Sequence, residues 1–382
     1  MKILLVSMNS IHFQRWTNQL KNSEHEVYWF DIRDGGYSEK LSWVNQIVGW
    51  KQKFPNLKGR SFVKKKLPWL YRKISFLLEN NTEKKFEAKL KEIEPDLVHS
   101  FVLYIACTPI YNVMKKYDSL KWIYSSWGSD LYYFQNQTKY LKEIKKVLPR
   151  VNYLFTDCKR DVELAKKYGF TGDVLGVFPG GGGYPLQDYQ QYILPVSVRT
   201  LILVKGYQGR SGRAIPILKA LKLLSSQLTN FKIVVFAADN DVKQFIIDNN
   251  LEKRLNLYVY SKKQFLPHLE IIKLMGQALI YIGNSNSDGI PNTLLEAIVM
   301  GAFPIQSNPG GATGEVIKHR ENGLLIEDCN NYRYIKKNIL TVLNDSKLTI
   351  NAFRINQEKI KPNYSRQIIA EKVLLKYNSV TN

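Results

Sequence analysis

The sequence contains little cysteine. Its 382 residues include three, Cys107, Cys158 and Cys329, which lie far apart and form no CxxC or Cys/His spacing. This pattern argues against a disulfide framework and against a structural zinc site. It fits a reducing cytosol.

Long apolar segments are also missing. Residues 3–6 are apolar, but the run stops at Ser7 and no small-residue cleavage site follows, so the segment is typical of a buried first strand rather than an export signal. No run of about 18 apolar residues occurs, because Lys273, Gly276 and Gln277 interrupt the longest candidate, residues 271–282. We expect a cytoplasmic protein that does not span a bilayer.

Acidic residues are scarce relative to basic ones. The chain has 33 Asp and Glu against 55 Lys and Arg, which gives a formal net charge of +22. A charge of this sign indicates the kind of partner and not the fold. Nucleic acid, an anionic membrane surface and phosphorylated substrates would all be attracted, so the distribution of the charge must decide among them.

The apolar content is sufficient for two globular cores. Hydrophobic residues make up 45% of the chain, which excludes general disorder, and the length favours two domains of roughly 150–200 residues each. Apolar runs alternate with helical patterns in both halves, which predicts an α/β protein with two Rossmann-like domains facing a cleft. Residues 178–185, rich in Gly and Pro, are predicted to form the mouth of that cleft and the crossover. The predicted domains are residues 1–190, joined by the C-terminal helix 363–380, and residues 195–362.

The alternation also predicts individual elements. Strands are expected at residues 3–6, 26–32, 97–101, 122–125, 153–156, 200–204, 232–237, 255–259, 278–282 and 303–306. Helices are expected at residues 12–22, 82–93, 214–227, 242–249, 293–300 and about 365–377. Thr82 is the expected N-cap of its helix, and the last helix is expected to pack back on the first domain.

One loop of the second half carries two acids. In parallel α/β sheets, ligands bind beyond the carboxyl ends of the strands, and residues 284–292 follow such a strand. Asp288 lies in this loop and Glu296 in the following helix, where a carboxylate can accept two hydrogen bonds from a vicinal diol such as ribose. Alternatively, Asp288 caps a turn and Glu296 complements the helix dipole.

Two further loops suit an anion. Residues 308–314 place glycines, and therefore accessible backbone N–H groups, between a strand and a helix. Residues 205–213 combine Lys205, Arg210 and Arg213 with three glycines directly after another strand, which suits a diphosphate. A solvated basic loop is the alternative.

Candidate polar residues in the first half also follow strands. Asp130, in the segment 126–130, is placed to accept hydrogen bonds from sugar hydroxyls or to cap a turn, and His12 and His99 lie near strand ends. Lone histidines are more often structural than catalytic. The pair Asp239 and Asp241 has the spacing of a divalent-metal site, but its place before the helix 242–249 favours a helix cap.

Residues 51–73 form a basic segment without any acid. Aromatic and aliphatic residues are interleaved with the cations, which is typical of contact with an anionic membrane surface. A solvated basic face is one alternative. Single-stranded nucleic-acid binding is another, but no nucleic-acid motif is present, so no such partner is expected. The cations are Lys51, Lys53, Lys58, Arg60, Lys64, Lys65, Lys66, Arg72 and Lys73.

Taken together, these motifs resemble the family 4 glycosyltransferases, a large retaining group with the GT-B fold. The most specific similarity covers residues 287–323, in which Asp288 and Glu296 are separated by seven residues. Residues 10–16, 95–99, 127–130 and 205–210 also match, so the resemblance extends from about residue 1 to residue 380. The sequence departs from the family pattern at Asp288 (usually Glu), Lys205 (commonly Arg), Trp127 (often His) and Asn9-Ser10 (usually a glycine pair).

The resemblance implies roles for particular residues. Glu296 would hold the donor ribose, Asp288 would face the donor sugar, and Lys205 and Arg210 would bind the diphosphate and neutralise the leaving group. Asp130 would join Asp288, Lys205 and Arg210 in catalysis. Further donor contacts would come from Gly289, Ile290, Pro291, Asn292, Leu295, Gly310 and Gly311. Acceptor contacts would come from His12, His99, Trp127 and Asp130.

The expected activity is transfer with retention from a nucleoside-diphosphate sugar, with UDP as the first candidate and without a metal or other cofactor. The expected acceptor is a lipid-linked glycan in surface polysaccharide synthesis (O-antigen, capsule or exopolysaccharide), at the inner face of the cell membrane. Two alternatives remain open at this point. One is a nucleotide-sugar epimerase or a phosphorylase on the same fold, and the other is a non-enzymatic membrane-binding or nucleic-acid-binding protein.

Overall fold

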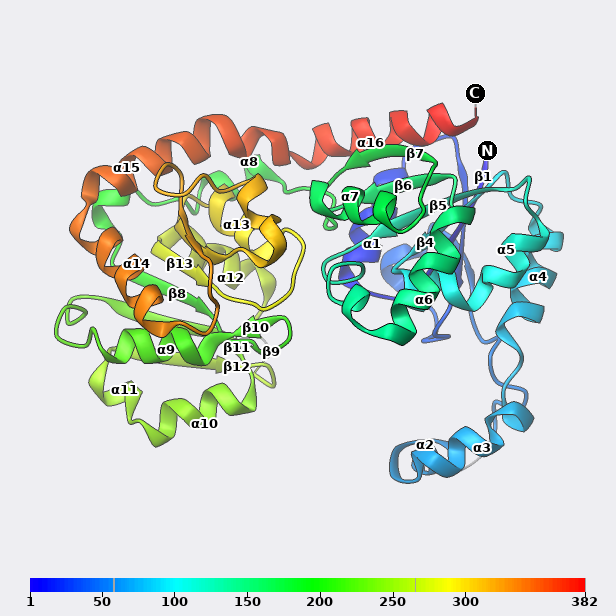
Figure 1. Cartoon of the computed structure of the whole chain (residues 1–382), viewed down its shortest axis with the longest axis horizontal. Helices are drawn as coiled ribbons and strands as arrows, with labels where there is room; N and C mark the ends of the chain where they lie inside the picture. Colours follow the sequence, from blue (N-terminus) through cyan, green and yellow to red (C-terminus); the bar gives the residue numbers. More distant parts are fainter. Residues whose placement is uncertain (58, 265, 382) are drawn as a thin grey trace. The chain divides into compact units, whose positions relative to one another are not determined.

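The computed structural model describes residues 1–57, 59–264 and 266–381. Its contacts divide the chain into two compact units, each with its own parallel sheet (Figure 1). Residues 1–156, 162–182 and 372 onward form the first unit, and residues 157–161 and 183–371 form the second. The change at Gly182–Gly183 falls inside the predicted crossover. Residues 157–161, 183–190 and 363–371, which the predicted division gives to the first domain, group with the second unit.

The first unit contains a doubly wound parallel sheet. Its strand order is β3-β2-β1-β4-β5-β6-β7, which reverses direction between β1 and β4. The predicted strands of this half are confirmed, and β3 and β7 are additional edge strands. The strands are β1 (Lys2–Ser7), β2 (Glu26–Asp31), β3 (Asn45–Ile47), β4 (Leu97–Phe101), β5 (Lys121–Ser126), β6 (Tyr153–Thr156) and β7 (Asp173–Val177).

Amphipathic helices cover this sheet with their apolar faces. Helix α1 ends at Thr17, earlier than predicted, and its Phe13 and Trp16 are buried. Helix α4 has the predicted bounds, but its N-cap is Asn81, whose side chain accepts the N–H of Lys84 at 2.9 Å. The helices are α1 (Ile11–Thr17), α4 (Thr82–Ile93), α5 (Tyr111–Lys116), α6 (Thr138–Val147) and α7 (Lys159–Lys167), whose first residues group with the second unit.

The basic segment of the first unit forms two helices that the sequence analysis did not predict. Helices α2 (Arg60–Lys66) and α3 (Pro68–Leu78) lie between β3 and α4 and pack against each other. We call residues 60–78 the α2–α3 hairpin; Figure 1 shows it as the blue pair of helices. The Tyr71 hydroxyl accepts from Arg60 Nε at 2.9 Å and donates to Glu79 Oε1 at 2.6 Å, which ties the two helices together.

The second unit has a parallel sheet of the same winding. Its strand order is β12-β11-β8-β13-β14-β15, which is the 3-2-1-4-5-6 order of a Rossmann sheet when the strands are numbered within the unit. The order therefore reverses between β8 and β13. The strands are β8 (Leu201–Lys205), β11 (Lys232–Ala238), β12 (Leu257–Ser261), β13 (Ala278–Gly283), β14 (Phe303–Ser307) and β15 (Leu324–Ile326), with a small antiparallel pair, β9 (Gln208–Gly209) and β10 (Gly212–Arg213).

Helices enclose this second sheet, and the last one continues into the first unit. From residue 372 onward α16 belongs to the first unit, where Tyr377 is buried and its hydroxyl accepts from Trp16 Nε1 at 3.1 Å. The predicted packing of the last helix on the first domain is therefore observed. The helices are α8 (Leu186–Gln190), α9 (Ala214–Lys222), α10 (Asn240–Asp248), α11 (Leu251–Arg254), α12 (His268–Gln277), α13 (Asn292–Val299), α14 (Tyr332–Asn344), α15 (Ser346–Ile355) and α16 (Arg366–Thr381).

Candidate active site

Three loops meet at the carboxyl edge of the second sheet, after the adjacent strands β8, β13 and β14. Asn284, after β13, exchanges backbone and side-chain hydrogen bonds with Arg213 at 2.8 and 2.9 Å. Ser285 donates its N–H to the hydroxyl of Ser307, at the end of β14, at 2.7 Å. The structure thus brings the three predicted donor loops together at the point where the strand order reverses, which is where doubly wound sheets bind ligands.

The predicted acids and cations of these loops share one electrostatic environment. Burial lowers the pKa of the Lys205 ammonium, and the carboxylates of Asp288 and Glu296 oppose that shift. Burial raises the pKa of Asp288, and the charge of Lys205 opposes the shift most strongly, with smaller contributions from Arg160 and Arg210. Charges that are partly withdrawn from water interact strongly with a ligand of opposite sign.

Two cations converge on one aromatic ring beside this cluster. The Nζ atoms of Lys205 and Lys262 lie 4.7 and 4.0 Å from the ring centroid of Tyr207. The like charge of Lys262 further lowers the pKa of Lys205. A diphosphate placed here would relieve this repulsion. Sequence reasoning missed Lys262, although it directly follows β12 and the strand-end rule would have found it.

Glu296 is held by a histidine that the sequence analysis did not consider. Glu296 lies on α13, is 4% exposed, and its Oε1 is 2.7 Å from His268 Nε2. His268 is the first residue of α12, which packs against α13. No sequence pattern links the two residues, because their proximity depends on helix packing.

The glycines and Asn292, which are predicted to contact the donor, differ in how closely other residues pack around them. A Cβ atom at Gly289 would lie 2.3 Å from Asp157 Oδ1, so a larger residue there would displace the Asp157 carboxylate. Gly310 and Gly311 adopt left-handed φ angles of 62° and 83° in the exposed loop after β14. Asn292 accepts the Tyr184 hydroxyl on its backbone oxygen at 3.1 Å.

Three further residues that are predicted to contact the donor lie at or near the start of α13 and differ in burial. Ile290 is half-buried, and Pro291 is buried at the N-cap position of α13. Leu295, predicted to contact the donor, is 1% exposed in the hydrophobic core. Its side chain therefore serves helix packing, and we do not retain it as a donor contact.

Arg160, within the segment 157–161, connects the acid loop with the glycine loop. Its Nη1 donates to the backbone oxygens of Asp288 at 2.9 Å and Pro309 at 2.8 Å. Its Nη2 pairs with Asp161 Oδ1 at 2.8 Å, and the side chains of both residues are buried. Sequence reasoning missed Arg160 because it lies far from both loops along the chain.

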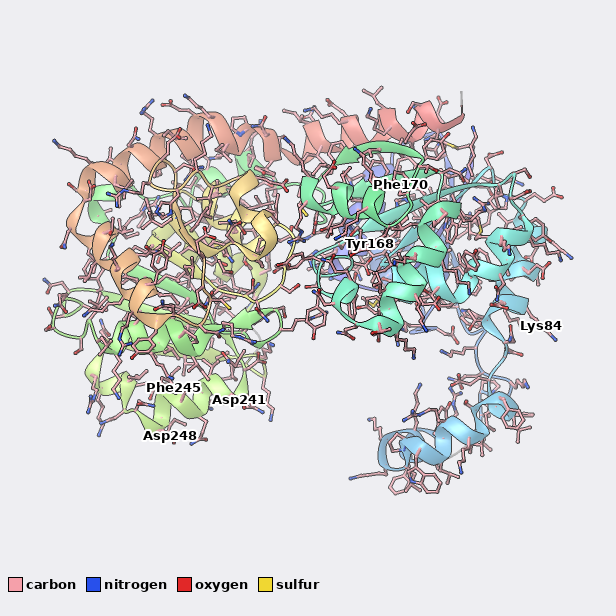
Figure 2. All side chains as sticks on the ribbon, in the orientation of Figure 1. Lys84, Tyr168, Phe170, Asp241, Phe245 and Asp248 are labelled. Carbon is pink, nitrogen blue, oxygen red and sulfur yellow. The ribbon has the colours of Figure 1, made fainter. Side chains whose placement is uncertain are left out.

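Two groups of acids have the composition of a metal site. The Oδ1 atom of Asp239 forms an ion pair with Lys262 Nζ at 2.6 Å, and its Oδ2 accepts a hydrogen bond from the N–H of Gln208 at 2.8 Å. Asp239 therefore occupies the N-cap position of α10 without capping it, contrary to the sequence prediction. Asp241 lies in the first turn of α10 (Figure 2).

In the described chain, Asp157, Cys158 and Asp161 also bring ligand atoms within 4.8 Å of one another. Because Arg160 already pairs with Asp161 and burial raises the pKa of the Cys158 thiol, we assign no metal there.

Two of the predicted acceptor residues are adjacent in the first unit. His12 lies on α1 and Trp127 follows β5, and their ring centroids are 6.3 Å apart in an edge-to-face arrangement. Both side chains are partly exposed. Trp127 also packs at 4.9 Å from Phe101, at the end of β4. The pair therefore lies at the carboxyl edge of the first sheet.

His99 is enclosed in the core of the first unit. It is 0% exposed, with Nδ1 at 2.6 Å from the Tyr377 hydroxyl and Nε2 at 2.8 Å from the Ser125 hydroxyl. Burial lowers its pKa well below the usual value, which favours the neutral ring. Both ring nitrogens serve the packing of α16 and β5, and we correct its predicted acceptor role to a structural one.

Asp130 supports a strained turn. It is 2% exposed, and its Oδ2 accepts the N–H of Leu103 at 2.7 Å and the hydroxyl of Tyr124. Val102, between β4 and Leu103, has a φ angle of 68°, which is costly for a β-branched residue. We therefore interpret Asp130 as a residue that holds this turn, and we do not retain its predicted acceptor and catalytic roles.

Comparison with known proteins agrees with this architecture. The sequence matches the family model of Glycosyl transferases group 1 over residues 200–359 and that of Glycosyl transferase 4-like over residues 2–158. No curated protein matches the sequence.

Solved structures share the fold along nearly the whole chain. A glycosyltransferase from Rickettsia africae ESF-5 is 16% identical, with a TM-score of 0.69, and the match covers 99% of this chain and 98% of that one. Anabaena Alr3699/HepE in complex with UDP and glucose is 13% identical, with a TM-score of 0.72 and coverage of 99% and 100%. The lipopolysaccharide outer core galactosyltransferase WaaB is 15% identical, with a TM-score of 0.68 and coverage of 99% of both chains. The chain thus has the GT-B fold and belongs to the group 1 glycosyltransferases, enzymes of class EC 2.4.

Proposed function

We propose that this glycosyltransferase uses a UDP-sugar donor and transfers the sugar with retention of configuration and without a metal ion. The observation that carries the proposal is the meeting of Lys205, Arg210, Asp288 and Glu296 where the strand order of the second sheet reverses. The structure of Anabaena Alr3699/HepE with UDP and glucose supports the choice of donor, because that protein shares the fold.

Each donor residue has a role that follows from its chemistry. Lys205 and Arg210 bind the diphosphate and stabilise the negative charge that develops as the sugar leaves. The exposed backbone around Gly310 and Gly311 contacts the donor, and Glu296 accepts hydrogen bonds from the ribose. Asp288, in the loop after β13, accepts hydrogen bonds from the donor sugar.

The acceptor in this proposal is a lipid-linked glycan of surface polysaccharide synthesis, bound by the first unit beside His12 and Trp127. The α2–α3 hairpin supports the lipid part. Phe62, Trp69 and Phe76 are 63%, 58% and 70% exposed, which is unusual for large apolar side chains unless a partner covers them. Exposed cations accompany them on the same two helices: Lys64, Lys65, Lys66, Arg72 and Lys73.

The charge balance of the hairpin favours an anionic membrane surface. Glu79 pairs with Lys51 and Arg60, so these two predicted membrane contacts are engaged within the protein, and Lys58 lies outside the described residues. At about 1 kcal/mol per cation, the five exposed cations suffice for reversible docking. No described helix has the length and apolarity to cross a membrane. On the strength of the exposed cations and aromatic side chains, we propose a peripheral position at the cytoplasmic face of the membrane.

A donor screen tests the catalytic proposal. The melting temperature is measured with UDP-, GDP- and TDP-sugars, and turnover of the best donor is followed by NMR of the anomeric proton, with and without EDTA. We expect a UDP-sugar to stabilise the protein, the product to keep the donor's anomeric configuration, and EDTA to have no effect. Full conversion of the donor sugar without acceptor would indicate an epimerase and would contradict the proposal.

Vesicle sedimentation tests the membrane proposal separately. The protein is pelleted at low salt with vesicles of neutral lipid alone or of neutral lipid mixed with anionic lipid. We expect recovery only with the anionic vesicles and its loss at high salt. Equal recovery with both kinds of vesicle would refute a charge-driven contact.

A further inference from the structure

The contact between His268 and Glu296 joins two helices beside the donor loops. The carboxylate is 4% exposed, whereas the imidazole side chain is 34% exposed. His268 thus extends from the protein surface to a nearly buried acid, and its Nε2 lies 2.7 Å from Glu296 Oε1. A buried carboxylate is costly without hydrogen-bond partners, and the imidazole supplies one.

Local structure fixes the position of the imidazole. His268 is the first residue of α12, and Pro267 before it occupies the N-cap position with φ −54° and ψ 142°. Helix α12 packs against α13, which carries Glu296 four residues after its start. His268 and Glu296 therefore both lie on helices that pack against each other, and not in loops.

A carboxylate that must receive two hydroxyl groups of a ribose has to be oriented in advance. A glutamate side chain has three rotatable bonds, and ordering them when the ligand binds would cost affinity. A hydrogen bond from the imidazole to one carboxylate oxygen restricts these rotations before the ligand arrives.

We propose that His268 is a positioning residue that orients Glu296 for the ribose diol and thereby sets the preference of this enzyme for ribonucleotide donors. The inference rests on the proposed function, because that function assigns Glu296 to the ribose. It adds a residue that determines the selectivity for the ribose of the nucleotide. This residue acts through Glu296 and does not itself react.

A purely structural role for His268 makes a different prediction. If the imidazole only stabilised a buried carboxylate, its removal would lower the melting temperature and weaken all nucleotides by the same factor. A positioning role weakens only those nucleotides that have ribose hydroxyl groups. The ratio of two affinities separates the two roles, because both ligands encounter the same folded fraction.

The experiment is titration calorimetry of the full chain with UDP and with 2′,3′-dideoxy-UDP. The proteins are the wild type, His268→Ala, His268→Gln and the control Glu270→Ala, whose exposed carboxylate on the same helix pairs with Lys273. We expect His268→Ala to weaken UDP roughly ten- to a hundredfold, the range for a hydrogen bond to a charged group, and to leave dideoxy-UDP unchanged. Glutamine places an amide nitrogen near the position of Nε2, so His268→Gln should restore most of the affinity for UDP.

The outcomes separate this inference from the proposed function. If the wild type binds UDP better than dideoxy-UDP but His268→Ala weakens both equally, or neither, the positioning role is refuted and the proposed function stands. If the wild type does not distinguish the two ligands, or binds neither, Glu296 does not hold a ribose, and the proposed donor site fails together with the inference.

Discussion

The donor loops of the second unit and the α2–α3 hairpin of the first are both rich in cations. These cations differ in their burial and in the groups that surround them. Lys205 is half-buried and interacts with the charges of Asp288 and Glu296, and burial lowers its pKa. Lys64, Lys65 and Lys66 are exposed on a helix next to exposed aromatic side chains. Withdrawn charges act on one ligand at close range, whereas exposed charges act additively on an extended surface. Environment, more than composition, therefore separates a candidate catalytic site from a proposed docking surface.

The largest expected effect is a loss of turnover that leaves membrane binding unchanged. Lys205→Met removes a cation from the site of the leaving diphosphate and should lower kcat by about 10²- to 10³-fold, as does the loss of one preorganised donor in other enzymes. Vesicle binding should remain at the wild-type level. Steady-state kinetics and sedimentation measure the two properties. A variant that keeps wild-type turnover would remove Lys205 from the mechanism.

The converse substitution should affect only membrane binding. Replacing Lys64, Lys65 and Lys66 by Glu loses at least about 3 kcal/mol of attraction to anionic vesicles, or more than a hundredfold in affinity. Turnover with a water-soluble acceptor should be unchanged.

The matched control for this variant reverses three exposed lysines on α6 of the same unit, Lys139, Lys142 and Lys145. It changes the net charge equally and should bind vesicles much more tightly than the hairpin variant. Equal losses in the two variants would mean that net charge, and not the hairpin, drives docking.

Glycine substitutions compare how tightly the two regions are packed. A Cβ at Gly289 would lie 2.3 Å from Asp157 Oδ1, so Gly289→Ala should destabilise the fold by about 1–3 kcal/mol. At Gly59, before the hairpin, no described atom lies within 4 Å of such a Cβ, and only the φ angle of 80° opposes Gly59→Ala, at about 1 kcal/mol. Denaturant unfolding measures both. A larger loss at Gly59 would reverse the comparison.

The smallest expected effect is a gain in stability at the donor site. Burial lowers the pKa of Lys205 from its ordinary value of 10.5, so the charged ammonium destabilises the ligand-free fold at neutral pH. Lys205→Met should therefore slightly raise the melting temperature at pH 7. The gain should shrink as the pH approaches and exceeds 10.5, where the wild-type amine is neutral in both the folded and the unfolded states. A gain that grows with pH would contradict this electrostatic explanation.

Most of the fold could be predicted because buried parallel strands are continuous apolar runs. Every strand expected from such a run is present, with bounds shifted by at most a few residues. The short strands β3, β7 and β15 were missed because they are too short or too interrupted to stand out. The hairpin helices α2 and α3 were missed because cations and Pro68 obscure their periodicity. The sequence analysis also did not predict helices α5, α6, α7, α8, α11, α12, α14 and α15.

The site could be predicted only in part, because position along the chain does not determine which way a side chain points. The strand-end rule predicted that the loops of Lys205 and Asp288 meet, and they do, since carboxyl ends of parallel strands lie at one edge. The same rule wrongly selected His99 and Asp130, whose side chains turn into the core. His268 and Arg160 could not be found at all, because packing between distant segments brings them to the site.

A crystal structure with bound UDP tests the central claim most directly. We predict the diphosphate against Lys205 and Arg210, the ribose hydroxyls on Glu296, and the chain around Gly310 and Gly311 along the nucleotide. A nucleotide bound elsewhere, or a ribose that points away from Glu296, would contradict the assignment of the donor site to these loops.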